Sequence, residues 1–346
     1  MNRDSCLDIM KGIGILAVIA GHCAGMQAYS NILTLKLIYS FHMPMFFIIA
    51  GFFYKEKSEL LNKLKVDFKR LIIPYIITSI AFLLYEMLTN TNFLFIYKYI
   101  IIAIIWGTGE SHTSAIWPTM PHIGAIWFLL ALFWCRTFFN LIHIYARRPY
   151  ITVLIIAILA TIADRYVINL PLGIFPGLSA MTFYLIGHHI NIYKDIHSMF
   201  YKYTIVICAI CWILHLLYSK IDMCICYFKY YPIDILGTTF GTIVVYTVSK
   251  YFSMSNISIL ITKLGQVSLI VLCFHTLEHN IVHYESLSFV PNNWFIIFII
   301  RAILCISLTI TWCILVKSTK LLISKNSYFS TTKKEKAEKR RCKIKQ

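Results

Sequence analysis

The segment Asp8-Ile-Met-Lys11-Gly-Ile-Gly-Ile, which continues through apolar residues to Gly21-His22, decides how the chain is organised. Asp8, Lys11 and His22 stand in a run that is otherwise apolar enough to cross a membrane as a helix. Because charge inside a membrane is costly, an intramembrane ionisable residue indicates function. Helical spacing brings the three groups within about 60° of one stripe, with Lys11 and His22 roughly 16 Å apart along the axis. This stripe is therefore the first candidate site.

The composition of the 346-residue chain is that of a membrane protein, since 59% of the residues are apolar and only 14% are charged. The apolar runs are about twenty residues long, so we predict an all-α polytopic membrane protein with about ten transmembrane helices. The run 93–106 is shorter and is predicted to form one short re-entrant or interfacial helix. The predicted spans are 8–27, 36–54, 71–89, 123–143, 150–164, 175–192, 203–219, 233–251, 259–280 and 294–316.

Basic residues in the loops predict the orientation of the chain. With ten spans, most Lys- and Arg-rich loops fall on the same side as the N-terminus, so both termini are predicted to be cytoplasmic. Residues 1–316 would form the membrane-embedded domain. Residues 317–346 carry eleven Lys or Arg against two Glu and are predicted to be a disordered cytoplasmic tail that rests on anionic lipid. Nucleic acid is not an expected partner, because no folded basic domain accompanies the tail.

Other polar side chains fall in the outer halves of the predicted spans, among them His42, His275, Glu278 and Arg301. Each of these residues alone could simply bond a carbonyl of a neighbouring helix. As a set they favour a polar interior, because ionisable residues at membrane depth usually face a bundle interior or water-filled cavity. Pro44, two residues after His42, is expected to bend the second span.

The motifs in these spans resemble acyltransferase family three, a family of membrane acyltransferases, and in particular its fucose 4-O-acetylase-like branch. The similarity covers nearly the whole chain. It rests on the first-helix segment from Asp8 to His22, and on Phe41-His42-Met-Pro44-Met-Phe-Phe47, Lys69-Arg70-Leu-Ile-Ile-Pro74-Tyr75, Ile126-Trp127-Phe-Leu129 and Ser268-Leu-Ile-Val-Leu-Cys-Phe-His275.

The resemblance implies an enzyme of the bacterial cytoplasmic membrane that takes an acyl group, acetyl in the branch resembled, from acyl-CoA inside. The group would be delivered to a hydroxyl of a cell-surface or lipid-linked glycan outside. Many family members carry Arg where this chain has Lys11. Lys keeps the charge but loses the planar two-bond contact of a guanidinium.

Acyl transfer from a thioester to an alcohol needs a base, a group that stabilises the oxyanion and a site for the anionic CoA. His22 is the candidate base or, alternatively, a covalent acyl carrier. Asp8 would hold Lys11 in place, and Lys11 and Arg70 could contact the CoA phosphates. We expect the acceptor pocket to be lined by His42, Trp127, His275, Glu278 and Arg301.

The sequence leaves two further interpretations to compare with acyl transfer. A transporter or flippase of polysaccharide precursors would share the helices, the aromatic residues and the buried charges, but it has no evident need for the Asp8, Lys11 and His22 stripe. A metal site is not expected, because the cysteines lie mostly within apolar runs and are explained by packing. No permanently bound cofactor is predicted, and acyl-CoA would act as the donor substrate.

Overall fold

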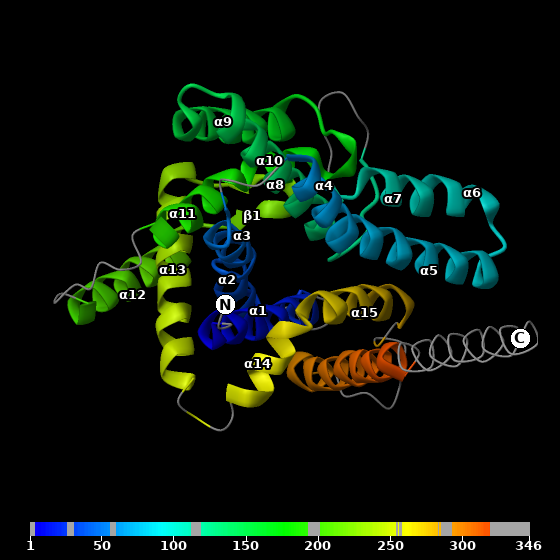
Figure 1. Cartoon of the computed structure of the whole chain (residues 1–346). Coiled ribbons are helices and arrows are strands. Elements are labelled where there is room, and N and C mark those ends of the chain that lie inside the picture. The colour runs from blue at the N-terminus through cyan, green and yellow to red at the C-terminus, as the bar shows by residue number, and fades with distance from the viewer. Residues whose placement is uncertain are drawn as a thin grey trace, which may run out of the picture.

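Long apolar helices make up most of the computed structural model (Figure 1), which describes residues 4–25, 31–55, 60–111, 119–192, 201–253, 255, 258–282, 284 and 293–318. Within these residues, seven helices are long and apolar enough to cross a membrane. They are α1 (Ser5–Ala24), α2 with α3 (Ile32–Phe52), the segment Leu60–Thr89, α8 (Trp127–Tyr145), α9 (Pro149–Tyr166), α13 (Tyr231–Phe252) and the C-terminal helix Trp294–Ser318.

An eighth span forms if α14 (Ser258–Gln266) and α15 (Ser268–Ile281) are counted as one helix bent by 75°. The predicted all-α membrane fold is therefore confirmed at the level of seven or eight spans. The count of ten and the cytoplasmic placement of both termini stay predictions. The basic tail lies almost wholly outside the described residues.

Several predicted spans are interrupted. The second consists of α2 (Ile32–Tyr39) and α3 (His42–Phe52), and the break at Ser40 and Phe41 comes just before Pro44, which cannot donate to the carbonyl four residues earlier. The third begins earlier than predicted, because α4 (Leu60–Asp67) and a π-helical turn at Phe68–Ile72 lead into α5 (Ile73–Thr89).

The remaining elements are shorter. The predicted re-entrant run is helical from Phe93 to Trp106, through α6 (Phe93–Phe95), a π-helical segment (Ile96–Ile101) and α7 (Ile102–Trp106). The 3₁₀ turn Pro171–Gly173, α10 (Ile174–Ser179) and α11 (Met181–Ile192) follow α9. After α12 (Tyr201–Tyr218), strands β1 (Ile221–Asp222) and β2 (Tyr227–Phe228) form a small antiparallel hairpin around the turn Met223–Ile225.

Two glycine-mediated contacts position the helices around the site. A Cβ at Gly51 of α3 would overlap the carbonyl oxygen of Tyr184, and one at Gly187 of α11 would overlap that of Ile48, so α3 and α11 approach backbone to backbone. In the same way, Gly265 of α14 packs against the Asp8 carbonyl of α1. The bend between α14 and α15 then carries α15 toward the C-terminal half of α1 (Figure 1).

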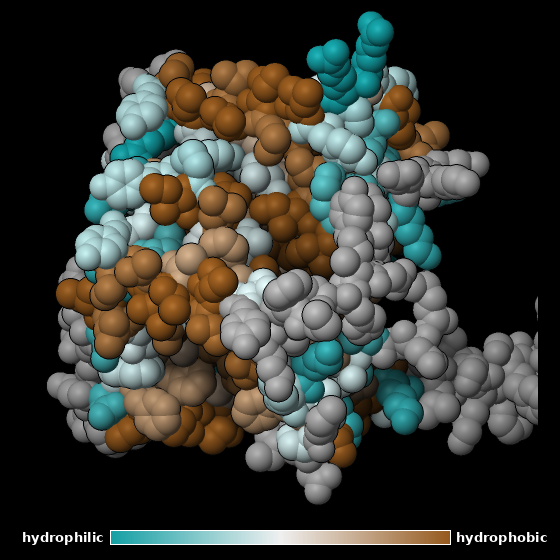
Figure 2. Space-filling model, turned by 90° about the vertical axis from the view of Figure 1, so that its left-hand side faces the viewer, coloured by the Kyte–Doolittle hydropathy of each residue, from teal (hydrophilic) through white to brown (hydrophobic). Residues whose placement is uncertain are grey.

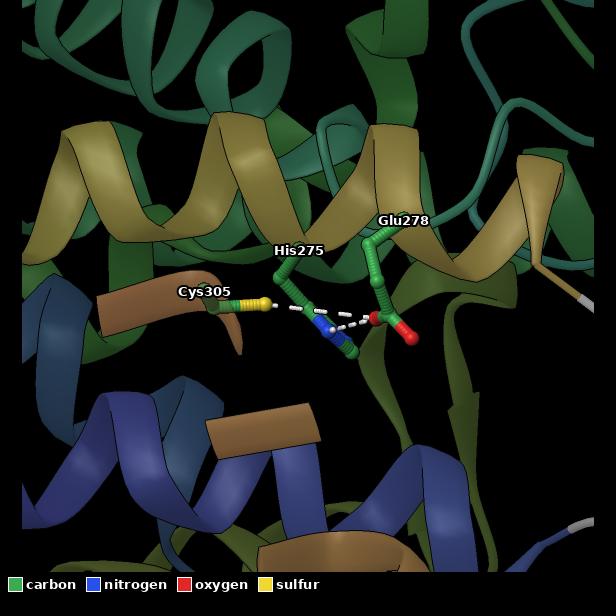
Figure 3. Close-up of side chains that lie close together, drawn as sticks. All are labelled: His275, Glu278 and Cys305. Carbon is green, nitrogen blue, oxygen red and sulfur yellow. Dashed lines mark hydrogen bonds and ion pairs between the residues drawn. The ribbon is translucent and has the colours of Figure 1, made fainter. Parts of the chain in front are cut away.

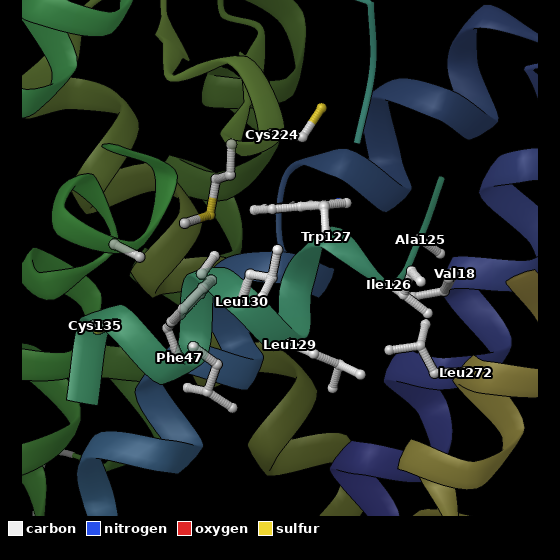
Figure 4. Close-up of a cluster of buried hydrophobic side chains, with 14 of the residues drawn as sticks. Val18, Phe47, Ala125, Ile126, Trp127, Leu129, Leu130, Cys135, Cys224 and Leu272 are labelled. Carbon is white, nitrogen blue, oxygen red and sulfur yellow. The ribbon is translucent and has the colours of Figure 1, made fainter. Parts of the chain in front are cut away.

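The buried core runs through α1, α3, α8 and α15, where Val18, Phe47, Leu129 and Leu272 pack together with Ile126 (Figure 4). The face of the molecule shown in Figure 2 has broad apolar areas. On α9, for example, Ile151 is 52% exposed and Leu159 is 58% exposed. Large apolar surfaces of this kind fit helices that face lipid rather than water.

Candidate functional site

A cavity of about 1060 Å³ opens between α1, α2, α3, α8, the β-hairpin and α15. Lys11, Ile15, Val18 and His22 of α1 all line it, at spacings that place them on one face of the helix. Of the stripe predicted from the sequence, Lys11 and His22 therefore lie in one wall of a single cavity, whereas Asp8 does not line it.

Asp8 fixes the position of Lys11 in this wall. The Lys11 Nζ lies 2.5 Å from Asp8 Oδ1, and Gln266 Nε2 donates to Asp8 Oδ2 at 3.2 Å. Asp8 is only 2% exposed, whereas the Lys11 side chain keeps 23% exposure on the cavity side. The pairing leaves a cation at the wall whose counter-ion is buried behind it.

Further along the same wall, His22 lies beside two histidines of α15. Its ring centroid is 4.8 Å from that of His279 and 5.2 Å from that of His275, and the two α15 rings are 6.0 Å apart. His22 and His279 both line the cavity, whereas His275 is fully buried behind them.

A buried ion pair lies behind the three histidines. Arg301 of the C-terminal helix is 1% exposed, and its Nε donates to Glu278 Oε1 at 2.8 Å. Its Nη2 lies 2.7 Å from His279 Nδ1, and its Nη1 lies 3.7 Å from Cys23 Sγ on α1. The Arg301 guanidinium thus joins three helices at the end of the cavity where His22 lies.

Comparison with known families shows to which family the chain belongs. A family model described as "Acyltransferase domain" matches residues 4–316, nearly the whole chain. The chain belongs to acyltransferase family three. The comparison with curated proteins found no match, and neither did the comparison with solved structures. Together with its apolar helices, the match makes the protein a membrane acyltransferase.

One cluster in the acyltransferase has the ligand types and spacing for a metal ion. His275 Nδ1 lies 3.4 Å from Glu278 Oε2, and Cys305 Sγ lies 3.9 Å from the same oxygen (Figure 3). However, the Glu278 carboxylate already pairs with Arg301, whose positive charge would repel a divalent cation. We therefore interpret this cluster as an ion-pair network.

A second group of possible ligands, Glu110, Asp222 and Cys224, lies where the β-hairpin borders the cavity. Burial raises the pKa of the Cys224 thiol well above its usual value, and the nearby Asp222 carboxylate raises it further. The Cys224 Sγ donates to Asp222 Oδ1 at 2.9 Å. Because a metal-bound cysteine must be a thiolate, this thiol fits a hydrogen-bond donor better than a ligand.

The other predicted site residues fall into two groups. His42 and Trp127 line the cavity, and His42 donates from Nδ1 to the Ile38 carbonyl at 2.7 Å, so a neutral ring carries its lone pair on Nε2. Arg70 lies exposed on the π-helical turn and is not among the cavity-lining residues. Neither are His275, Glu278 and Arg301, which lie behind the wall that His22 and His279 form.

Sequence reasoning missed His279, Glu110 and Asp222, which also line the cavity. The signal for His279 was present, because a residue four positions after His275 lies on the same helix face. Glu110 and Asp222 come from a loop and a two-residue strand, where no periodic pattern marks which side chains point inward.

Proposed function

We propose that this acyltransferase transfers an acyl group, acetyl as in the fucose 4-O-acetylase-like branch, from cytoplasmic acyl-CoA to a hydroxyl of a cell-surface or lipid-linked glycan. The chain would act in the bacterial cytoplasmic membrane. The observation that carries the proposal is that Lys11 and His22 line one cavity. A phosphate-binding cation and a proton-accepting imidazole thus share the space in which a donor and an acceptor would meet.

The donor would enter from the end of the cavity nearest Lys11. A Lys ammonium is a point charge suited to phosphate, and Asp8 holds it at the wall. Lys11 and His22 are roughly 16 Å apart along a helix, a distance that an extended pantetheine arm largely covers. The phosphates of CoA could then remain near Lys11 while the thioester lies beside His22. Arg70 could contact the CoA phosphates only outside the cavity.

His22 would take the proton of the acceptor hydroxyl. As the hydroxyl oxygen forms a bond to the thioester carbon, the carbonyl electrons move to its oxygen. Collapse of this intermediate breaks the C–S bond, and the leaving CoA sulfur receives the proton from His22. In the covalent alternative His22 first accepts the acyl group and then passes it to the hydroxyl. Both routes require His22 at the reacting carbon.

The acceptor would occupy the part of the cavity that His42 and Trp127 line. An indole face packs against the apolar face of a sugar ring, and a His Nε2 lone pair can accept a hydrogen bond from a hydroxyl. This combination suits a carbohydrate.

The experiment compares His22→Ala with His189→Ala, a half-buried helical histidine that does not line the cavity. Cells expressing each variant at equal membrane levels are analysed for ester-linked acetate on the surface glycan by mass spectrometry. We expect His22→Ala to remove the acetate while the glycan remains, and His189→Ala to retain it. Unchanged acetate in His22→Ala would refute the catalytic assignment, and loss of the whole glycan would favour transport of a glycan precursor.

A further inference from the structure

His279 is held between a buried cation and the cavity. Its Nδ1 lies 2.7 Å from Arg301 Nη2, while its ring lines the cavity beside His22. Arg301 in turn is held by Glu278, whose Oε1 accepts from Arg301 Nε at 2.8 Å. Two contacts in series, from Glu278 to Arg301 and from Arg301 to His279, therefore set the orientation of the His279 ring.

This contact decides which nitrogen of His279 carries the proton. A guanidinium has only donors, so His279 Nδ1 must be the acceptor in the contact with Arg301. A neutral imidazole has one N–H, and with Nδ1 accepting, that N–H is at Nε2. A second proton at Nδ1 would remove the hydrogen bond and bring two positive charges together. His279 is thus a fixed hydrogen-bond donor and a poor base.

From this geometry we propose that His279 is a second catalytic residue, which donates from Nε2 to the thioester oxygen as the tetrahedral intermediate forms. The proposal rests on the acyl transfer proposed above and names the group that stabilises the oxyanion. It holds whether His22 is a general base or an acyl carrier, because the carbonyl oxygen gains negative charge in both routes.

The positions of the two rings fit these two roles, His22 at the attacking oxygen and His279 at the carbonyl oxygen. The His22 and His279 ring centroids are 4.8 Å apart, on α1 and α15, and both rings line the cavity. Because the rings are nearly in contact, the carbonyl carbon would lie in the cavity in front of both rings, with the attacking oxygen on the His22 side and the carbonyl oxygen toward His279. No atom is lost or gained at His279, since it keeps its proton throughout.

Three substitutions of His279 distinguish the role of its Nε2 donor, which would act in the cavity, from the role of its contact with Arg301. His279→Gln keeps both functions, because its Oε1 can accept from Arg301 and its Nε2 can reach the cavity. His279→Asn keeps an acceptor for Arg301, but its amide is one methylene too short to replace His279 Nε2. His279→Leu removes both. Full-length proteins are compared in inverted membrane vesicles that contain the endogenous glycan, with ¹⁴C-labelled acetyl-CoA as donor.

We expect His279→Gln to retain kcat within about tenfold of the wild type, whereas Asn and Leu lower it by about 10²–10³-fold, the usual loss for one oxyanion donor. The KM for acetyl-CoA should stay within about threefold for all three. Melting temperatures of the purified proteins report on folding. Equal rates for folded Gln and Asn variants, a wild-type rate for Asn, or an effect on KM alone would overturn the proposal.

The same vesicles separate this inference from the proposed function. If wild-type vesicles transfer no label to glycan, or if His22→Ala transfers as much as the wild type, then the proposed function itself fails. If the wild type is active, His22→Ala is inactive and the His279 variants do not follow the predicted order, then only the role of His279 fails.

Discussion

Lys11 Nζ lies 2.5 Å from Asp8 Oδ1, yet Lys11 faces the cavity and Asp8 does not. The carboxylate is nearly fully buried and also accepts from Gln266. Asp8 therefore fixes the ammonium without taking up space in the cavity, and the donors of Lys11 that do not contact Asp8 can bind an anion.

If Lys11 binds the phosphates of acyl-CoA, Lys11→Met should raise the KM for acetyl-CoA by about 10–100-fold, as expected for loss of a charged hydrogen bond. Lys11→Arg should retain binding because it keeps the charge. Lys36→Met is the matched control, since Lys36 also lines the cavity but lies on α2. Equal KM values for Lys11→Met and Lys11→Arg would remove the phosphate contact.

The Arg301–Glu278 pair should be more sensitive to substitution than the more exposed ion pair of Arg136 with Asp67. Glu278→Gln leaves a 1% exposed guanidinium without its counter-ion, so we expect the free energy of unfolding in detergent to fall by about 3–5 kcal/mol. Asp67→Asn is the comparison, because the Arg136 side chain is 33% exposed and can be rehydrated, which predicts a loss of about 1 kcal/mol or less. Similar losses for both variants would contradict this ranking.

The close contact of α1 with α14 predicts a coupled loss of stability and donor binding. In Gly265→Ala the new methyl group would overlap the Asp8 carbonyl, and we expect a destabilisation of about 1–3 kcal/mol. Because Asp8 holds Lys11, the KM for acetyl-CoA should rise as well. At Gly25, a Cβ would meet Gly21 O at 3.2 Å and Leu35 at 3.6 Å, so Gly25→Ala should change stability by only about 0.5 kcal/mol. Chemical unfolding in detergent and acetyl-CoA kinetics measure both effects.

The sequence alone predicts the positions of the helices better than the bends between them. The apolar runs located nearly every helix, because hydropathy over about twenty residues is a strong signal. The 75° bend at Val267 could not be predicted in this way, because Gly265 lies just before it but a single glycine specifies neither a bend nor its angle. Hydropathy reports where a segment prefers lipid and does not report its direction.

In the candidate site, too, some positions could be predicted from the sequence and others could not. Lys11 and His22 could be placed on one wall because helical periodicity relates residues within one helix. The position of Arg301 could not be predicted, because it depends on how the C-terminal helix packs against α15, where Arg301 contacts Glu278 and His279. Contacts between helices decide whether a polar residue lines the cavity or supports a residue that does.

Asp222 in the β-hairpin should make the stability of the protein depend on pH, with a defined sign. Burial raises the pKa of Asp222 from 3.8 to about 7, and the Glu110 carboxylate contributes in the same direction. Between these two values the unfolded chain loses this proton while the folded protein keeps it. The contribution of Asp222 to stability is therefore complete below pH 3.8 and is lost as the pH rises through about 7. The slope should be roughly 1.4 kcal/mol per pH unit at most.

His122 provides a control of opposite sign, because burial lowers its pKa below 6.5. Its neutral form in the folded protein stabilises above pH 6.5, and that contribution is lost as the pH falls through its lowered pKa. Melting curves of wild type, Asp222→Asn and His122→Gln between about pH 5 and pH 8 separate the two groups. The stability of the wild type relative to Asp222→Asn should fall as the pH rises, and its stability relative to His122→Gln should rise. A difference for Asp222→Asn that is independent of pH would show that this carboxyl is already ionised in the folded protein throughout the range.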